Sequence, residues 1–395
     1  MNFKDKAFGL KDKLVEFRRD FHSHPELSFH EERTNGIIRK FLEDNGIEIQ
    51  EIGSGYSVVG LIRGAYPGKT IGLRGDMDAL PMPETVDVPF KSTVENVMHA
   101  CGHDAHTSAL MGAALLLNEV KDQMHGNVKL FFQAAEEQLP GGAKLMIEHG
   151  ALENPYVDAV MGFHVSNSLE VGKVAFGTTP GNAASDTYKF KIIGKGGHGA
   201  FPHMTIDPIT ISAYFITALQ SIVSRNVEPV QGAVITIGSI HGGLKENVIA
   251  DEVEMLATVR SLSPEVRDLL HKRIREICKG TEVMYNCKVE YEVQMGYPVL
   301  QNDPDFVAKY AIPSSEKIIG AENVLHYKRT NMGGEDFAYF LQQRPGCFGS
   351  LGSRNEETGC IHSCHSPLFK IDETCIPISA GCLAQTAWDF LEMNK

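Results

Sequence analysis

Three short apolar segments, separated by stretches with helical character, most constrain the fold of this chain. Residues 70–74, 127–133 and 158–163 are apolar enough to be strands buried on both faces of a sheet. The stretches near 105–119 and 141–149, which separate the last two segments, have the composition of helices. Alternating strands and helices of this kind predict an α/β domain.

Polar side chains follow each of these strands at its end. Asp76 and Asp78 come after the first strand. Glu136 and Glu137 come after the second strand, and His164 comes after the third. In open α/β sheets, ligands bind outside the carboxyl ends of the strands. We therefore expect the functional site at this edge of the sheet.

The order of expected strands and helices changes after about residue 184, and the α/β alternation returns at about Tyr297. The 395 residues exceed the roughly 250–300 at which single cores stop growing, so two domains are expected. We predict a catalytic domain of residues 1–184 and 297–395 and an inserted α+β domain of residues 185–296, with a ferredoxin-like pattern. Its expected strands are 188–193, 234–240, 252–260 and 283–293, and its expected helices lie near 207–225 and 264–279.

The densest group of metal-binding residue types is the octet His-Ala-Cys-Gly-His-Asp-Ala-His at 99–106. Thiolate and neutral imidazole are ligands that divalent transition metals prefer. Gly102 separates Cys101 from His103 and allows a tight turn between the two ligands. The rival interpretation is a cysteine nucleophile with a histidine base. It lacks an obvious oxyanion element and leaves the paired glutamates unexplained.

The other candidate ligands lie far from the octet in sequence. Adjacent side chains at a strand end point in different directions, so one of Glu136 and Glu137 can bind metal while the other acts as general base. A solvated acidic turn is the alternative. His164 is either a ligand or a core histidine. From the cysteine- and histidine-rich segment 360–365 we favour His365 as the single ligand, because no second Cys-x-x-Cys pair completes a separate zinc site.

A glycine-rich loop, Gly194–Gly199, follows the first expected strand of the inserted domain and has the spacing of the dinucleotide-binding pattern. No helix follows at once, and no acidic residue stands about twenty residues further on. We therefore reject a dinucleotide site. His198 on this loop and His203 just after it can instead reach a substrate. The segment Gly333–Phe337 is expected to begin a helix, where acidic side chains suit the N-terminus.

Composition limits the kinds of binding partner and the cell compartment that we expect. The formal net charge of −13 disfavours nucleic-acid and anionic-membrane partners, which require a basic surface. No segment approaches the ~20 apolar residues that span a bilayer, and residues 1–21 lack the apolar core of a signal peptide. The eight cysteines are scattered, which is typical of free thiols in a reducing compartment. We expect a cytoplasmic protein with a small-molecule substrate.

A series of ordered motifs covers nearly the whole chain. These are Arg18–Leu27, Leu73–Pro81, Met98–His106, Gln133–Glu137, Gly162–His164, Gly194–His203, Asn331–Tyr339 and His365–Phe369. In them the chain resembles the M20 metallopeptidase and amidohydrolase family. The resemblance is to the branch of N-acyl-amino-acid amidohydrolases, hippurate hydrolases and plant auxin-conjugate (IAA-amino acid) hydrolases.

The resemblance implies a mixed-sheet, zinc-peptidase-like catalytic domain with an inserted ferredoxin-like lid and dimerisation domain. It implies two divalent metal ions, zinc or manganese, with cobalt and nickel as alternatives. Most of the family bridges the metals with an aspartate, and this branch has Cys101 there, so we infer a bridging thiolate. One metal would take Cys101, Glu137 and His365, and the other would take Cys101, His103 and His164.

The resemblance also implies roles beyond the ligands. Glu136 matches the general base, and Asp78 matches an aspartate that orients a ligand. The remaining matches lie in the inserted domain. His198 matches a residue that stabilises the tetrahedral intermediate, and Asn247 and Arg260 match positions that hold a substrate carboxylate.

Two features depart from the family pattern. Ala250 stands where a proline is usual, which would loosen that loop. Cys360 and Cys364 place extra thiols beside the last ligand, where a thiol can compete for metal or sensitise the site to oxidation.

The expected activity is hydrolysis of the amide of an N-acyl-L-amino acid, such as an acetyl or benzoyl derivative, by a homodimer or higher homo-oligomer. A dipeptidase or carboxypeptidase with the same dimetal centre is the alternative enzyme. A non-catalytic, metal-dependent binding protein is the alternative of another class, and the intact ligand set with Glu136 argues against it.

Overall fold

The computed structural model describes residues 1–326 and 330–395. They form two compact units, each with its own hydrophobic core. The large unit comprises the described residues of Met1–Thr179, Gln301–Arg329 and Asp336–Lys395, and the small unit comprises Pro180–Leu300 and Thr330–Glu335. The short Thr330–Glu335 segment in the small unit has no counterpart in the sequence-based division. None of the helices within residues 1–326 and 330–395 has the length and apolar composition of a membrane-spanning helix.

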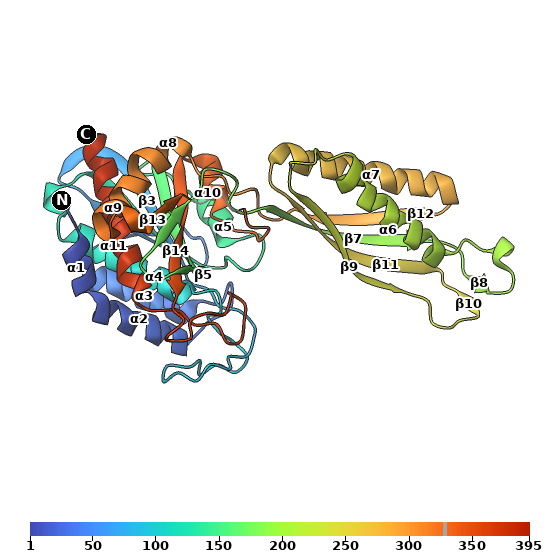
Figure 1. Ribbon diagram of the computed structural model, residues 1–395, viewed down its shortest axis with the longest axis horizontal. Coiled ribbons are helices and arrows are strands. Elements are labelled where there is room, and N and C mark those ends of the chain that lie inside the picture. Colours follow the sequence, from blue (N-terminus) through green and yellow to red (C-terminus); the bar gives the residue numbers. More distant parts are fainter. Residues whose placement is uncertain (327–329) are drawn as a thin grey trace. The chain divides into compact units, whose positions relative to one another are not determined.

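The large unit is built on an eight-stranded mixed sheet, drawn in Figure 1. Its strands are β1 (Glu48–Gln50), β2 (Val58–Arg63), β3 (Tyr66–Asp76), β4 (His125–Gln133), β5 (Ala159–Glu170), β6 (Val174–Phe176), β13 (Val324–His326) and β14 (Gly346–Arg354). The sheet order is β1-β2-β4-β3-β5-β14-β6-β13. The central strands β4, β3, β5 and β14 run parallel, so their carboxyl ends share one edge. The expected α/β class with a mixed sheet is confirmed.

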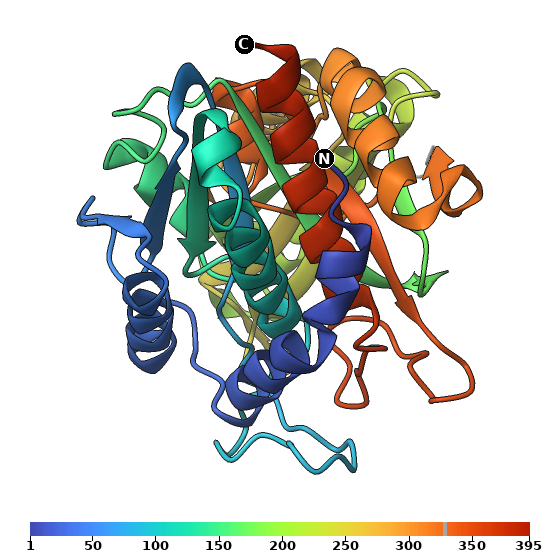
Figure 2. The same ribbon diagram turned by 90° about the vertical axis from the view of Figure 1, so that its left-hand side faces the viewer.

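The large unit also contains helices, several of which pack against this sheet. They are α1 (Lys4–Gly9), α2 (Lys11–Ser23), α3 (Glu32–Asp44), α4 (His103–Asn118), α5 (Gly142–Glu148), α8 (Pro304–Phe306), α9 (Ile312–Ile319), α10 (Ala338–Gln343) and α11 (Cys375–Met393). Figure 2 shows the dark-blue α2, the teal α4 and the red α11 side by side in front of the sheet. Gly112 of α4 makes this approach close, because a Cβ there would lie 2.7 Å from Leu14 Cδ1 and 2.8 Å from Ala380 Cβ.

The strand that carries His164 is longer than the sequence predicted. The apolar segment ends at Phe163, but β5 continues to Glu170 because its backbone stays paired with β14, where Ser350 is opposite His164. The pairing of β5 with β3 stops at Gly162. His164 therefore lies inside a strand rather than after it, but still beyond the carboxyl end of the β3–β5 pairing.

The small unit is a four-stranded antiparallel sheet with two helices packed against it. Its main elements are β7 (Ala184–Ile193), α6 (Pro208–Arg225), β9 (Ala233–Gly242), β11 (Glu252–Ser261), α7 (Pro264–Tyr285) and β12 (Lys288–Gln294). The connectivity is β-α-β-β-α-β and the sheet order is β12-β7-β11-β9, as in ferredoxin-like units. The expected strand at 283–293 is wrong at its start, because α7 continues through Tyr285 and ends at Asn286 with φ of 50°.

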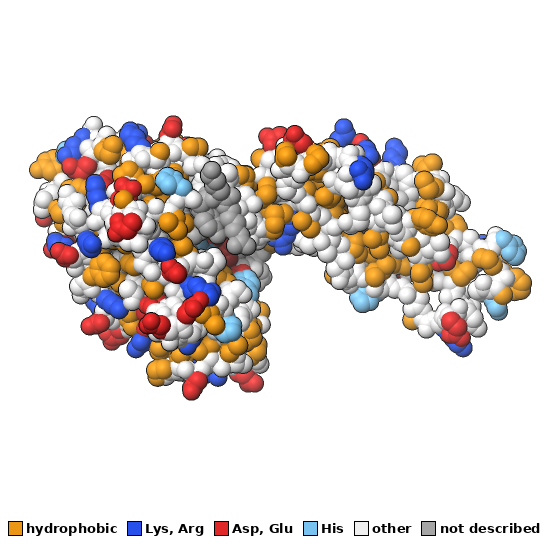
Figure 3. Space-filling view, viewed as in Figure 1, with side chains coloured by type: hydrophobic (Ala, Val, Ile, Leu, Met, Phe, Trp, Pro, Cys, Tyr) orange, Lys and Arg blue, Asp and Glu red, His pale blue; other side chains and the backbone are white. Residues whose placement is uncertain are grey.

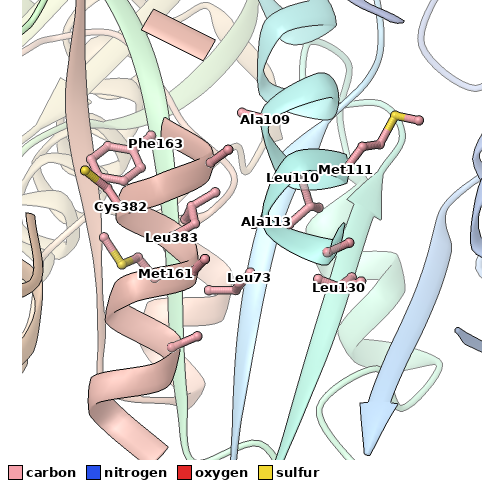
Figure 4. Close-up of a cluster of buried hydrophobic side chains, with 14 of the residues drawn as sticks. Leu73, Ala109, Leu110, Met111, Ala113, Leu130, Met161, Phe163, Cys382 and Leu383 are labelled. Atoms are coloured by element: carbon pink, nitrogen blue, oxygen red, sulfur yellow. The ribbon is translucent and has the colours of Figure 1, made fainter. Parts of the chain in front are cut away.

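Truncating a core side chain should destabilise the large unit. Leu73 of β3 is 0% exposed and lies among side chains of α4 and α11 in Figure 4. Leu73→Ala should lower the free energy of unfolding by about 2–5 kcal/mol, because it removes buried methyl groups and leaves a cavity. Urea unfolding followed by the fluorescence of Trp388, the single tryptophan, measures this.

The matched control is Leu244→Ala, because Leu244 in the small unit is fully exposed. It should change the free energy of unfolding by no more than about 0.5 kcal/mol. Equal, small effects of both substitutions would contradict the packing described for Leu73.

Candidate metal centre

The five predicted ligands converge at the carboxyl edge of the sheet in the large unit. Cys101, His103 and His164 place their ligand atoms within 4.8 Å of one another. Cys101, Glu137 and His365 form a second group by the same measure. Both groups contain Cys101, so two cation positions that share its sulfur fit the side chains present.

Asp78 holds His103 in the orientation that a ligand needs. The Nδ1 of His103 lies 3.0 Å from both the carboxylate and the backbone carbonyl oxygen of Asp78. Since both partners are acceptors, Nδ1 carries a proton, and in the neutral ring Nε2 is the nitrogen that keeps its lone pair. Nε2 is buried and has no hydrogen-bond partner among the described residues. Asp76 Oδ2 lies 3.5 Å from this nitrogen, so a positive charge here, on a metal ion or a second ring proton, is favoured.

His164 has the same division of roles between its two ring nitrogens. Its Nδ1 donates to the backbone carbonyl of Val165 at 2.7 Å, and its Nε2 lies 3.3 Å from Cys101 Sγ. The lone pair of Nε2 therefore points toward the shared sulfur. This tautomer is the one that metal-binding histidines with a hydrogen-bonded second nitrogen adopt.

His365 reaches the site through strained backbone. It has φ of +63°, a region that non-glycine residues rarely adopt. Its backbone N–H donates to the carbonyl of Ala100 at 2.8 Å, which fixes it beside Cys101. Its Nε2 lies 3.0 Å from a carboxylate oxygen of Glu137. The contact brings the last ligand in sequence to the pair at the end of β4.

Gly102 explains the spacing of Cys101 and His103. It has φ of +87°, and a Cβ at this position would lie 2.4 Å from Val165 Cγ2. Only glycine meets both the backbone conformation and the close contact. The tight turn lets the thiol before it and the imidazole that begins α4 face the same space.

Charges in this site favour a cation. Burial lowers the pKa of His103, but Asp76 and Asp78 outweigh that effect and raise it well above its usual range. A hydrogen bond with Cys364 and burial raise the pKa of the Cys101 thiol. The shift of His103 reflects nearby carboxylates, whose negative charge a divalent cation would compensate.

A third group, Asp76, His103 and His106, also lies within 4.8 Å and is fully buried. Protein contacts already engage two of its members, since His106 Nδ1 donates to Asp76 at 2.6 Å and His106 Nε2 accepts from the Val165 backbone at 2.9 Å. These contacts tie the end of β3 to the residue after His164. His106 had no role predicted from its sequence position, although its place in the octet was a signal.

The extra cysteines differ in their surroundings. Cys364 and Cys101 each shift the pKa of the other's thiol, so Cys364 is a neighbour of the shared sulfur. Cys360 is buried at 3% exposure, and its thiol lies 3.3 Å from the hydroxyl of Thr358. Cys364 is therefore placed to affect the ligands directly.

The predicted lid residues belong to the small unit, and two of them lie together. His198 in β8 (Gly197–His198) is opposite Val248 in β10 (Val248–Ile249). The backbone N–H of Gly199 donates to the carbonyl of Asn247 at 2.9 Å. The Nδ1 of His198 accepts from the Ala200 N–H at 3.1 Å, so the imidazole proton resides on Nε2 when the ring is neutral.

Arg260 lies at the opposite end of the small unit's sheet. It pairs with Ser185 at the start of β7, whereas β8 and β10 lie beyond Ile193 and Glu252 at the other end of the β7–β11 pair (Figure 1). Eight residues of strand separate Glu252 from Arg260, which is about 26 Å. Arg260 donates to the hydroxyl of Thr258 at 3.0 Å and to the carbonyl of Met332 at 3.2 Å. The sequence-predicted substrate residues therefore form two groups within this unit.

His203 belongs to the group around His198. It lies in the 3-10 turn Pro202–Met204 and is exposed. Its ring centroid is 6.4 Å from that of Phe201, which is 5.3 Å from that of His198. The glycines of the loop serve close backbone packing, since a Cβ on Gly196 would lie 2.7 Å from the Ile249 carbonyl oxygen.

Comparison with known proteins identifies relatives along the whole chain. The model of peptidase family M20/M25/M40 matches residues 72–389. Thermostable carboxypeptidase 2 of Saccharolobus solfataricus is 42% identical and covers 98% of each chain. N-acetyl-L-cysteine deacetylase of Bacillus subtilis is 39% identical and covers 98% of this chain and 90% of its own length.

Solved structures show the same similarity. One from methicillin-resistant Staphylococcus aureus has a TM-score of 0.93 at 38% identity and covers 99% of this chain and 100% of its own. A dinuclear metal-binding peptidase of the M20 family from Bacillus subtilis has a TM-score of 0.83 at 32% identity, covering 97% of this chain and 99% of its own.

Removing the charge of Asp78 should weaken metal binding. Asp78→Asn keeps the shape but replaces one acceptor oxygen with a donor that faces Ser28, His103 or the Glu137 N–H. We expect the affinity for Co²⁺ or Mn²⁺ to fall about 10–100-fold, measured by competition with a chelator. Asp44→Asn, at an exposed helical site, is the control. Equal affinities in both variants would show that Asp78 does not orient a ligand.

Proposed function

Because the chain belongs to peptidase family M20/M25/M40, we propose that it is a dinuclear metal hydrolase of N-acyl-L-amino acids. It would cleave the amide and release a carboxylic acid and the free amino acid. The observation that carries this proposal is the pair of ligand groups that share Cys101, with Glu136 beside them. The deacetylase relative acts on an N-acetyl amino acid by its name, which supports the acyl-amino-acid class over a larger peptide.

The metal ions are proposed to be divalent, with zinc or manganese preferred and cobalt or nickel as alternatives. Cys101, Glu137 and His365 would hold one ion, and Cys101, His103 and His164 would hold the other. When bound, such ions polarise the acyl carbonyl and lower the pKa of water. The matched structure from Bacillus subtilis is described as dinuclear, which supports two positions rather than one.

Glu136 is proposed to move the proton. It follows β4 and is buried at 6% exposure, and it lies within 4.8 Å of His103 and Glu137, measured between their ligand atoms. A carboxylate there would accept a proton from the attacking water and deliver it to the nitrogen of the leaving amine. Its neighbour Glu137 would remain a ligand, so two adjacent acids would have separate roles.

His198 and Arg260 are proposed to act on the substrate from the small unit. The Nε2–H of His198 can donate to the oxygen that becomes negative when water attacks the carbonyl. The guanidinium of Arg260 can bind the amino-acid carboxylate through two hydrogen bonds. Asn247 and His203 lie in the same group as His198 and would contact the substrate from that side.

The separation within the small unit supports a site completed by two chains. About 26 Å of strand separates Arg260 from Glu252, and β8 with His198 lies beyond the Glu252 end. His198 and Arg260 of one small unit are therefore too far apart to touch one small substrate. We propose a homodimer in which His198 and Asn247 of one chain serve the partner's metal centre. Exposed apolar side chains on the small unit, including Tyr214, Ile240 and Leu256, support this, and Figure 3 shows hydrophobic side chains spread over its visible face.

A carboxypeptidase is the second candidate, and the relative named thermostable carboxypeptidase favours it. Both reactions break an amide beside an amino acid with a free carboxylate, so the same centre serves either. The distinguishing feature is the group on the acyl side, which is a simple acyl group in one case and a peptide in the other. We propose the cytoplasm as the site of action, consistent with eight free cysteines among the described residues.

The experiment that tests the function compares substrates and metals together. Chelator-treated protein would be reloaded with Zn²⁺, Mn²⁺, Co²⁺ or Ni²⁺ and assayed on N-acetyl and N-benzoyl amino acids, free dipeptides and N-blocked dipeptides. We expect higher kcat/KM on the acyl amino acids than on either peptide set. Faster cleavage of the peptides would replace the proposal with the carboxypeptidase, and no cleavage by any metal form would remove both.

Glu136→Gln should abolish most turnover while the protein keeps its metals. The substitution preserves the shape of the side chain but removes its ability to accept a proton. We expect kcat to fall about 10²–10⁴-fold, with the metal content unchanged by elemental analysis. Near wild-type kcat in the fully loaded variant would exclude Glu136 as the general base.

Mixing two inactive variants tests the dimer. Glu136→Gln subunits keep His198, and His198→Ala subunits keep the metal centre, so a mixed dimer has one complete site if His198 acts across the interface. We expect activity to return on mixing, since a donor to the oxyanion contributes about 10²–10³-fold in rate. A mass-tagged control shows whether subunits exchange. If they exchange and activity does not return, His198 acts within its own chain.

A further inference from the structure

A buried glutamate far from the candidate ligands in sequence contacts the turn that carries Glu136 and Glu137. Glu31 is 0% exposed. One of its carboxylate oxygens accepts the backbone N–H of Ala135 at 2.8 Å. The other oxygen, Oε2, is buried and has no hydrogen-bond partner among the residues that the structure describes. Burial and the nearby charge of Asp78 raise the pKa of Glu31 to about 7. A buried carboxylate oxygen without a hydrogen-bond partner lowers the stability of the folded protein, so stability alone does not explain an acid at this position.

Ala135 lies in backbone that L-amino acids avoid. Its φ is +54°, in the left-handed region where Cβ crowds the backbone. The residue is held on both sides, because its N–H donates to Glu31 and its carbonyl accepts the N–H of Gly142 at 2.9 Å. The reversal at Ala135 directly precedes Glu136, so it determines where the next two side chains point.

A second buried carboxylate holds the other end of the same turn. The backbone N–H of Glu137 donates to Asp78 at 3.0 Å. That carboxylate oxygen also accepts the hydroxyl of Ser28 at 2.6 Å. Two acids from other parts of the chain thus each accept one N–H of residues 135–137, and Ser28 and Glu31 come from one short segment before α3.

We propose that Glu31 is a positioning residue that holds Ala135 in its left-handed conformation and so directs Glu136 and Glu137 into the metal centre. This rests on the proposed roles of those two glutamates. Glu31 belongs to none of the candidate metal-binding groups found among the described residues. Its contribution passes through one hydrogen bond to a backbone that would otherwise relax to a more favourable conformation.

The test compares Glu31→Gln with Glu31→Leu. Glutamine keeps an acceptor for the Ala135 N–H, so kcat and metal affinity should stay near the wild-type values. Leucine removes the acceptor and should lower kcat about 10–100-fold, as small displacements of catalytic groups do, with KM within about twofold. Metal affinity, measured with Co²⁺ and a competing chelator, should also fall. Glu43→Leu, the same change at an exposed site of α3, should alter neither.

A second substitution tests the backbone directly. Glycine adopts positive φ about as readily as negative φ, so Ala135→Gly should restore about fivefold or more of the kcat lost in Glu31→Leu. A residue that only fills space would show no such rescue. If Glu31→Leu fails to fold, Ala135→Val in the wild-type background replaces it, because a β-branched side chain disfavours the same conformation and should lower kcat and metal affinity together.

The outcomes separate this proposal from the proposed function. Wild-type kcat and metal affinity in folded Glu31→Leu, equal losses in Glu31→Gln and Glu31→Leu, or no rescue by Ala135→Gly would each overturn the positioning role. If the wild-type protein hydrolyses no N-acyl amino acid, the function fails instead. The positioning role is then judged by Co²⁺ affinity alone, since Glu137 belongs to the same turn.

Discussion

The carboxylate of Asp78 is the interaction on which the candidate site depends most. It is fully buried and accepts hydrogen bonds from Ser28, His103 and the backbone of Glu137. Burial raises the pKa of Asp78, but the hydrogen bond and charge of His103 outweigh it and the net shift is downward. The side chain therefore stays ionised and links three segments: the loop before α3, the start of α4 and the turn after β4.

A second buried network, of ion pairs and hydrogen bonds, lies at the same edge of the sheet. Arg74 forms ion pairs with Asp76 and Asp336, and Gln133 hydrogen-bonds both Arg74 and Asp336. A buried ion pair gains little net stability once desolvation is counted, although leaving one partner unpaired is costly. This network contributes mainly by positioning, because it fixes the ends of β3 and β4 relative to each other.

Strained backbone and close packing occur together at the candidate metal centre. Ala135 and His365 both have positive φ without being glycine, and Gly102 admits a contact that no side chain would allow. Such conformations persist only where surrounding contacts over-determine them. Here those contacts are hydrogen bonds from the Ala135 N–H to the Glu31 carboxylate and from the His365 N–H to the Ala100 carbonyl. Local sequence preference alone would not choose these backbones.

Some features follow from the sequence because they arise from local patterns. Apolar strands alternating with helices determine the α/β class, and the acidic and histidine residues after those strands identify the edge where a site forms. The small unit's strand and helix order is readable for the same reason, except at Val283 and Met284. These apolar residues suggested a strand, but they lie exposed at the end of α7, because helix propagation and the cap at Asn286 outweigh β propensity.

Tertiary structure decided the rest, because the deciding contacts join residues far apart in the chain. The extension of β5 past His164 depends on pairing with β14, and the tautomer of His103 depends on Asp78, neither of which local pattern reveals. Glu31 carries no motif of its own and matters only through a backbone N–H about a hundred residues later. The distance between His198 and Arg260 likewise follows from strand register. Sequence determines which residues can do chemistry, and the folded backbone determines which of them meet.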